Sequence, residues 1–254
     1  MNLFCFLMKR RVVSKYMIIT AINGSQKGMN GTTYEMLKYL GEGIMKGNGT
    51  FDIINLLDQH IEQCRGCFAC WNEKRGSCVI KDDMYQLLNI IRASDMIFLA
   101  TPVYYHNVTI VMKKFLERLL PLNNAYVKKC DDGIYRHRCE DKIPSIVMVS
   151  SCSLSDYCNF DIISLYGKTI AQHLNTKVIA EIYRTEGSLF KTKIQNIKLV
   201  VNEYKKVWIK AGYELATDQC LSNMTLRDIK RPLLKKEIYI EVGNRLADNK
   251  EQNY

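Results

Sequence analysis

The stretch Met17-Ile18-Ile19-Thr20-Ala21-Ile22 is an almost unbroken apolar run. Such a run is expected for a β-strand that is covered on both faces, as in a parallel sheet. The polar segment 23–31 follows it, and apolar residues then recur at helical spacing from Met36 to Ile44. The stretch therefore predicts a strand–loop–helix unit, the first element of an α/β domain.

The same alternation continues along the chain. Further strands are expected at 51–57, 95–100, 146–149 and 177–183. Helical periodicity indicates helices at 84–91, 108–120, 160–174 and 190–212. Asp83, with Gln86 three residues later, resembles a capping box at the start of the first of these helices. Five strands that alternate with helices predict an open, doubly wound α/β sheet with helices on both faces, plus a C-terminal helical extension.

The composition is that of one globular domain with additions. The chain has 254 residues, 47% of them hydrophobic and 24% charged, which excludes a wholly disordered chain. No apolar run reaches the roughly 18 residues that a membrane-spanning helix needs, so no membrane partner is expected. The net charge of +10 comes from scattered lysines and arginines without a nucleic-acid-binding motif, so nucleic acid is not an expected partner either.

The chain divides into three parts. We expect an N-terminal extension at 1–16, a domain at 17–184, and a C-terminal helix and tail at 185–254 that pack on the core or on a partner subunit. Within the domain, 62–80 is a cysteine-rich loop. The polar segment 123–142 is too long for a simple connection and predicts an insertion, either a hairpin or an irregular excursion of the chain.

The cellular location is expected to be cytoplasmic. The apolar start of the chain precedes its basic residues, which is the reverse of a secretory signal. The ten cysteines crowd locally within a large chain instead of forming the framework of a small secreted domain. Both features favour a reducing compartment.

The loop after the first strand has the composition of a phosphate site. Glycines, hydroxyl side chains and a lysine occupy 24–33, at the start of the following helix. Backbone N–H groups, the helix dipole and hydroxyls can all face an anion there. The loop lacks the P-loop and G-x-G-x-x-G signatures, so a solvent loop with a helix cap is an equally open interpretation.

Two further loops carry groups that suit a flat heteroaromatic ligand. Thr101 to Asn107 follows the third strand and contains two tyrosines, a histidine and an amide. Ser150 to Ser153 follows the fourth strand and offers hydroxyl and N–H donors. The plainer alternative is that the tyrosines cover the end of the sheet and that His106 is a structural histidine.

Four cysteines in the loop 62–80 form the motif C-x2-C-x2-C-x7-C: Cys64, Cys67, Cys70 and Cys78. Three thiolates with this spacing can surround three irons of a [4Fe–4S] cluster, and a fourth completes the set. Zinc sites more often use two separated C-x2-C pairs. The spacing favours a cluster but leaves zinc and unliganded or redox-paired thiols open.

Three stretches together resemble the NADPH-dependent FMN reductase family of flavodoxin-like proteins, and within it the branch called iron–sulfur flavoproteins. They are Asn23-Gly24-Ser25 through Thr32, Cys64 through Asp82-Asp83-Met84, and Thr101-Pro102-Val103-Tyr104-Tyr105. The resemblance covers about 17–184 and implies a flavodoxin-like fold with a five-stranded parallel sheet.

The resemblance also implies which residues bind FMN. The first loop would hold the phosphate, and the second and third loops would lie on either side of the isoalloxazine. The residues so implied are Ser25, Lys27, Thr32, Thr33, Pro102, Val103, Tyr104, Tyr105, His106, Asn107, Ser150 and Ser151. The four cysteines would be metal ligands. No catalytic acid or base is expected, because the flavin does the redox chemistry.

The implied function is that of an FMN-dependent oxidoreductase. It would take electrons from NAD(P)H and pass them to a small-molecule or protein acceptor, through a [4Fe–4S] cluster if the cysteines hold one. One alternative is a non-enzymatic electron carrier or redox sensor partnered by a protein such as ferredoxin, which the basic charge would suit. Another is a zinc-stabilised binding module without flavin.

A homodimer or homotetramer is also expected. The helix from Val108 to Leu120 has apolar Ile110 and Val111 beside its core stripe, which is more apolar surface than one sheet face needs. Similar proteins pair through this region, and closed two-fold dimers are the commonest solution. The apolar tail from Leu233 to Ile240 would either wrap the neighbour or pack on its own subunit.

Overall fold

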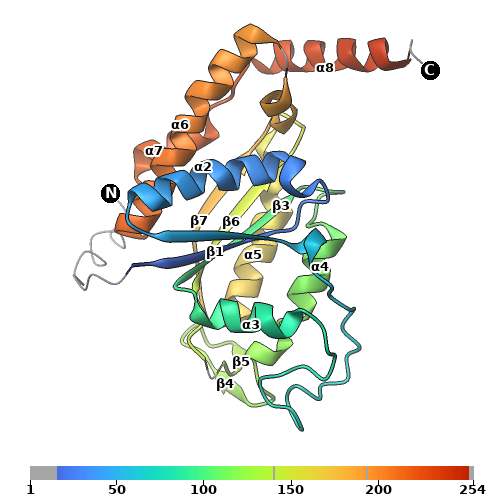
Figure 1. Cartoon of the computed structure of the whole chain (residues 1–254), viewed down its shortest axis with the longest axis vertical. Coiled ribbons are helices and arrows are strands. Elements are labelled where there is room, and N and C mark those ends of the chain that lie inside the picture. Colours follow the sequence, from blue (N-terminus) through green and yellow to red (C-terminus); the bar gives the residue numbers. More distant parts are fainter. Residues whose placement is uncertain (1–15, 140, 193, 252–254) are drawn as a thin grey trace.

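The structure is a computed structural model that describes residues 16–139, 141–192 and 194–251. Its centre is a five-stranded parallel sheet with the order β2-β1-β3-β6-β7 (Figure 1). The strands are β1 (Ile18–Asn23), β2 (Thr50–Asn55), β3 (Met96–Pro102), β6 (Ser145–Ser151) and β7 (Val178–Arg184). The chain runs outward from β1 to β2 and then crosses back to β3, so the order reverses beside β1. The predicted doubly wound sheet is confirmed.

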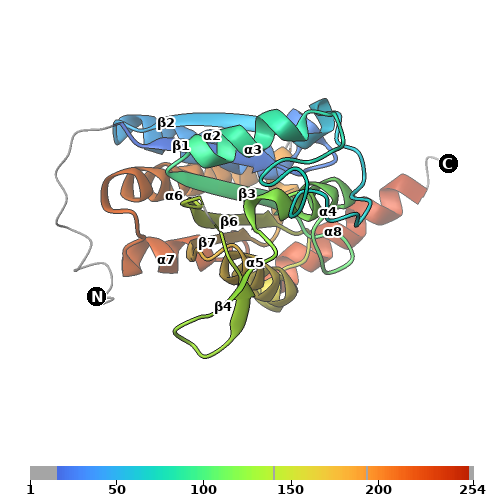
Figure 2. The same ribbon diagram turned by 90° about the horizontal axis from the view of Figure 1, so that it is seen from below.

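Helices cover both faces of the sheet (Figure 2). One face carries α2 (Thr32–Lys46), α6 (Gln195–Asp218) and α7 (Asn223–Lys230), and the other carries α3 (Met84–Ala93), α4 (Ile110–Glu117) and α5 (Asp161–His173). Side chains that alternate along each strand divide the core accordingly. In β3, for example, Phe98 joins the first core and Ile97 and Leu99 join the second.

The C-terminal helix α6 packs tightly on α2 of its own chain. A Cβ added at Gly212 would lie 2.0 Å from the carbonyl oxygen of Leu40, and one at Gly43 would lie 1.8 Å from that of Ile209. Trp208, one turn before Gly212, is fully buried. The two backbones therefore touch at a crossing that only glycines allow, and α6 completes the core on this face.

Smaller elements complete the described chain. Strands β4 (Val127–Lys129) and β5 (Tyr135–His137), within the polar segment 123–142, form an antiparallel hairpin that projects from the body (Figure 2). Helix α8 (Lys236–Glu251) extends away from the sheet (Figure 1). Short 3-10 helices lie at Gly28–Asn30, Leu56–Asp58, Leu120–Leu122, Tyr157–Phe160 and Gly187–Lys191. No helix of the described ranges is long and apolar enough to cross a bilayer.

Some local predictions differ from the structure. The long C-terminal helix continues to Asp218 instead of ending near 212. The prediction of a capping box at Asp83 is wrong, because the Asp83 side chain makes no cap hydrogen bond to the helix. It accepts instead from the backbone N–H of His60 (2.7 Å). The neighbouring Asp82 side chain accepts from the backbone N–H of Met84 (3.1 Å). Residues 1–15 of the expected N-terminal extension lie outside the described residues.

Candidate functional site

Three loops meet at the carboxyl edge of β1, β3 and β6. The Gly24 N–H donates to the carbonyl of Ala100 (2.8 Å), and the Thr109 hydroxyl donates to the carbonyl of Gly24 (2.6 Å). The Val103 N–H donates to the carbonyl of Ser151 (2.9 Å). The loops that the sequence singled out therefore form one continuous surface, at the position where ligands bind in sheets of this kind.

The N-terminus of α2 has the features of an anion-binding site. No side chain caps it, and its first N–H groups have no intrahelical partner. Ser25 is buried against Gly31, since a Cβ at Gly31 would lie 2.4 Å from the Ser25 hydroxyl oxygen. Lys27 lies exposed at the rim of the same loop. The combination of free N–H groups, helix dipole and lysine is suited to a phosphate.

The two threonines at the start of α2 use their hydroxyls within the protein. Thr32 donates to the carbonyl of Gly187 (2.9 Å), and the Thr33 hydroxyl lies 3.1 Å from that of Ser151 in the interior. The Ser150 hydroxyl is likewise buried and donates to the carbonyl of Thr101 (2.6 Å). The side chains of Thr32 and Thr33 therefore hold the loops together, and their hydroxyls are already paired within the protein.

The segment after β3 forms a tight turn. Tyr104 and Asn107 exchange two backbone hydrogen bonds of 3.0 Å, and the residues between them, Tyr105 and His106, have φ angles of 47° and 63°. Such a two-residue turn prefers Asn-Gly, and each larger residue in the left-handed region costs about 1 kcal/mol. The Tyr105 side chain is fully exposed. The turn therefore holds aromatic side chains outward at a conformational cost, as functional sites often do.

Two further residues of this surface were not identified from the sequence. Thr109 caps α4 by accepting from the N–H of Met112 (3.3 Å), and its hydroxyl also ties α4 to the first loop. A threonine before an apolar helical stripe is a cap signature that could have indicated it. Gly187 follows β7 and receives the hydroxyl of Thr32, and no local signal marks this role.

The cysteine loop is closed at its base by a buried ion pair. Arg118 donates to both carboxylate oxygens of Asp82 (2.7 and 2.9 Å) and to the carbonyl of Glu62 (2.7 Å). Asp82 in turn accepts from the N–H of Glu62 (2.8 Å). The exposed fractions of the Arg118 and Asp82 side chains are 1% and 0%. Arg118 thus joins Glu62, the first residue of the cysteine loop, to Asp82, two residues after its end.

The electrostatics of this pair keep Asp82 ionised. Burial alone would raise the pKa of the Asp82 carboxyl. Hydrogen bonds from Arg118, Glu62 and Met84 outweigh burial and hold the pKa below its ordinary value. The base of the loop therefore contains a buried arginine cation and a buried carboxylate whose opposite charges neutralise each other.

The four cysteines and Arg118 line one small cavity inside the loop. Burial, and then the negative charge of neighbouring Cys78, raises the pKa of the Cys70 thiol to about 11. The Arg118 guanidinium interacts with the Cys78 sulfur, and its buried Nε has no hydrogen-bond partner within the described chain. The donor set suits a thiolate-bound cluster. However, no three His, Cys, Asp or Glu side chains of the described residues are already arranged around a metal position.

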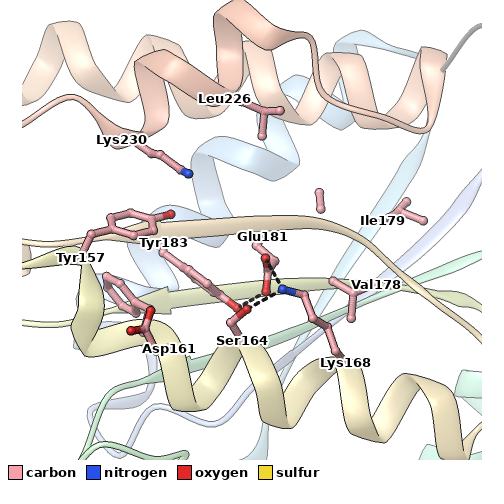
Figure 3. Close-up of a pocket in the computed structure, with 12 residues that line it drawn as sticks. Tyr157, Asp161, Ser164, Lys168, Val178, Ile179, Glu181, Tyr183, Leu226 and Lys230 are labelled. Atoms are coloured by element: carbon pink, nitrogen blue, oxygen red, sulfur yellow. Dashed lines mark hydrogen bonds and ion pairs between the residues drawn. The ribbon is translucent and has the colours of Figure 1, made fainter. Parts of the chain in front are cut away.

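A separate cavity of about 280 Å³ lies between α5, β7 and α7 (Figure 3). Its polar groups pair with one another: Lys168 contacts Glu181 (3.2 Å), and the Tyr183 hydroxyl donates to the same carboxylate (3.0 Å). None of the predicted flavin or metal residues lines it. We therefore do not assign it to the functional site.

Comparison with known proteins gives a family match and partial relatives. A family model described as NADPH-dependent FMN reductase matches residues 17–151, just over half of the chain. An iron–sulfur flavoprotein of Archaeoglobus fulgidus is 37% identical over 102 residues, 40% of this chain and 48% of the relative. One of Methanocaldococcus jannaschii is 32% identical over 110 residues, 43% of this chain and 55% of the relative. The chain spans about half the length of these curated relatives.

Solved structures share the fold at low sequence identity. NAD(P)H:quinone oxidoreductase from Methanothermobacter marburgensis aligns with a TM-score of 0.57 and 11% identity, over 79% of this chain and 98% of that chain. An FMN-dependent NADH-azoreductase from Bacillus anthracis, solved in complex with FMN, aligns with a TM-score of 0.55 and 14% identity, over 79% and 99%. These similarities support the fold.

Proposed function

Because the chain belongs to the NADPH-dependent FMN reductase family, we propose that it is an FMN-dependent oxidoreductase that accepts electrons from NAD(P)H. The observation that carries the proposal is the meeting of three loops at the sheet edge. There the uncapped start of α2 lies on the same surface as a turn that displays aromatic side chains. A flavin mononucleotide has a phosphate for the first feature and a flat ring for the second.

The residues of the chain bind and orient the cofactor. The first N–H groups of α2 hold the phosphate, and Lys27 neutralises part of its charge. Pro102 to Asn107 lie against the ring on one side, and the loop at Ser150 and Ser151 lies on the other. Bound FMN supplies the redox chemistry, so no side chain of the site needs to transfer a proton.

The test is FMN binding followed by anaerobic reduction. Fluorescence titration with FMN should show about three- to tenfold weaker binding for Lys27→Ala, since one cation near the phosphate is removed. Lys38→Ala, an exposed lysine farther along α2, is the matched control and should bind like the wild type. NADPH should bleach the flavin absorbance and sustain turnover with an added acceptor. If neither NADPH nor NADH bleaches it, the reductase proposal is wrong, and bleaching without turnover would indicate an electron carrier.

We further infer that the four cysteines bind a [4Fe–4S] cluster. The support is that they line one cavity, next to an arginine whose charge favours negative thiolates. Such a cluster needs reduced thiols, as the cytoplasm provides. Anaerobically purified protein should contain about four irons and four labile sulfides. One zinc and no sulfide would contradict the inference.

We also infer a homodimer that covers α4. Ile110 is 75% exposed at the start of this helix, beside the exposed aromatic turn. The start of the tail contacts its own chain instead, since Leu233 donates its N–H to Glu186 (2.8 Å) and the Tyr239 hydroxyl lies 3.0 Å from that of Ser188. Light scattering of FMN-loaded protein should give twice 29.4 kDa or more, and Ile110→Glu should lower the mass to the monomer. A wild-type monomer at micromolar concentration would refute the dimer.

A further inference from the structure

A second hollow lies next to the cysteine loop. Its volume is about 570 Å³, within the range of small-molecule sites. Four segments that are far apart in sequence build it: the cysteine loop, α4, the end of β5 and the end of α5. In Figure 1 the β4–β5 hairpin lies at the lower end of the molecule, and α4 and α5 lie above it. None of the predicted FMN residues lines it.

The walls are mainly apolar, with an aromatic pair among them. Leu116, Leu120 and Ile170 are only partly buried and line the hollow. Trp71 and His137 pack together, with ring centroids 4.4 Å apart. Flat, rigid walls of this kind favour a flat ring system, because stacking adds to the burial of apolar area.

The polar groups of the hollow are few and differ in how they are held. The indole N–H of Trp71 donates to the carbonyl of Leu120 (2.9 Å), which fixes the ring at the wall. The Nδ1 atom of His137, by contrast, has no hydrogen-bond partner among the residues that the structure describes. The imidazole is therefore not anchored through that nitrogen. His173 and Asn123 add polar groups at the same site.

The hollow also shares a wall with the cysteine cavity. Cys64 lines both spaces, and Leu120 and Glu117 lie between them. A molecule bound here would therefore lie against one of the four cysteines rather than against the flavin loops. The arrangement provides a second binding position in the same chain.

From this geometry we propose that the hollow is a binding site for a flat, largely apolar aromatic molecule of about two fused rings that carries one hydroxyl or carbonyl group. The ring system packs between Trp71 and the leucines, and the polar group contacts the histidines. Most of its walls are side chains outside the cysteine motif, and Cys64 is the one motif cysteine that lines it.

The test is calorimetric titration of FMN-saturated protein with 2-naphthol. Saturation with FMN keeps the probe out of the flavin site. A ligand of this size should bind with a Kd of about 0.1–1 mM. Ile170→Trp, which fills the hollow, should weaken binding at least about tenfold. Leu165→Trp is the matched control, because Leu165 lies on the same helix, is exposed and does not line the hollow; it should bind like the wild type.

The outcomes separate the alternatives. Equal FMN binding by the two tryptophan variants shows that both are folded. If Ile170→Trp does not fold, Leu116→Phe provides a second way to fill the hollow. No binding of 2-naphthol by the wild type, or unchanged binding by a folded filled variant, overturns the proposal. A lower mass for Ile170→Trp in light scattering also overturns it, by showing that a second copy of the chain occupies the hollow. If the chain binds no FMN at all, the proposed function fails. The same titration with 2-naphthol on FMN-free protein still decides whether the hollow binds an aromatic molecule.

Discussion

Replacement of Asp82 by asparagine tests the clamp at the base of the cysteine loop. Asparagine has nearly the same shape, so the change removes charge with little loss of packing. It leaves the buried Arg118 without a counter-ion and places an amide NH₂ where a carboxylate oxygen accepts from the guanidinium at 2.7 or 2.9 Å. Of the backbone N–H groups of Glu62 and Met84, one then faces the amide NH₂ and loses its acceptor, and the other keeps only a neutral one.

The expected loss of unfolding free energy is about 3–5 kcal/mol. This is the range for breaking a buried ion pair on one side, and the 1% and 0% exposed fractions place this pair in that class. Glu42→Gln is the matched control, since it breaks the exposed Lys46–Glu42 pair of 2.7 Å. That change should cost under about 0.5 kcal/mol. Urea unfolding measures both, followed by tryptophan fluorescence, which comes from Trp71 and from Trp208 in the core.

The stabilisation by the Asp82 carboxylate should depend on pH in a definite direction. The pKa of Asp82 is lower in the folded protein than its ordinary value, so the folded state prefers the carboxylate. The stabilisation is therefore fully present above the unfolded pKa of about 4 and is lost as the pH falls through the folded pKa. The difference between wild type and Asp82→Asn should be largest at pH 7 and should begin to shrink as the pH falls below the unfolded pKa of about 4.

Two results would refute this reasoning. The first is an Asp82→Asn protein within about 1 kcal/mol of the wild type at pH 7, which would mean that the pair is not buried as described. The second is a difference that stays constant from pH 7 to pH 3, which would mean that the loss is steric rather than electrostatic. Replacing both partners by apolar residues should cost less than Asp82→Asn alone, because no unpaired charge then remains.

Three further predictions address other parts of the fold. Gly212→Ala should destabilise the protein by about 1–3 kcal/mol in urea unfolding because its Cβ meets the α2 backbone, whereas Gly243→Ala, in open space on α8, should stabilise it by up to about 1 kcal/mol. Tyr105→Asn with His106→Gly should raise stability by about 1–2 kcal/mol by relieving the left-handed residues, yet weaken FMN binding in a fluorescence titration. In metal-free protein, the rate of alkylation of Cys70 by iodoacetamide should keep rising up to about pH 11, because burial raises the pKa of this thiol. The rate for an ordinary thiol levels off near pH 9. A plateau of the Cys70 rate near pH 9 would contradict the burial of this side chain.

The sequence alone was sufficient for the architecture and for the meeting of the three loops at one edge of the sheet. Apolar runs such as Met17 to Ile22 and the helical stripes are local patterns, and burial on both faces of a sheet follows directly from them. The order of strands and helices then implies where their carboxyl ends meet. The spacing of the four cysteines is equally local, so their gathering around one cavity was predictable. The assignment of individual residues to FMN and metal remains a prediction.

Only the tertiary structure decided what each polar group does. Thr32 has the composition of a phosphate ligand, yet its hydroxyl donates to Gly187, a residue 155 positions away. Arg118 holds the base of the cysteine loop through Asp82, a residue 36 positions earlier. The hollow beside Trp71 exists only because four distant segments meet there. Hydrogen bonds need donor and acceptor within about 3 Å, and close packing needs surfaces that match. Hydrogen bonding and packing therefore depend on how distant segments meet in space, and they leave no pattern in the local sequence.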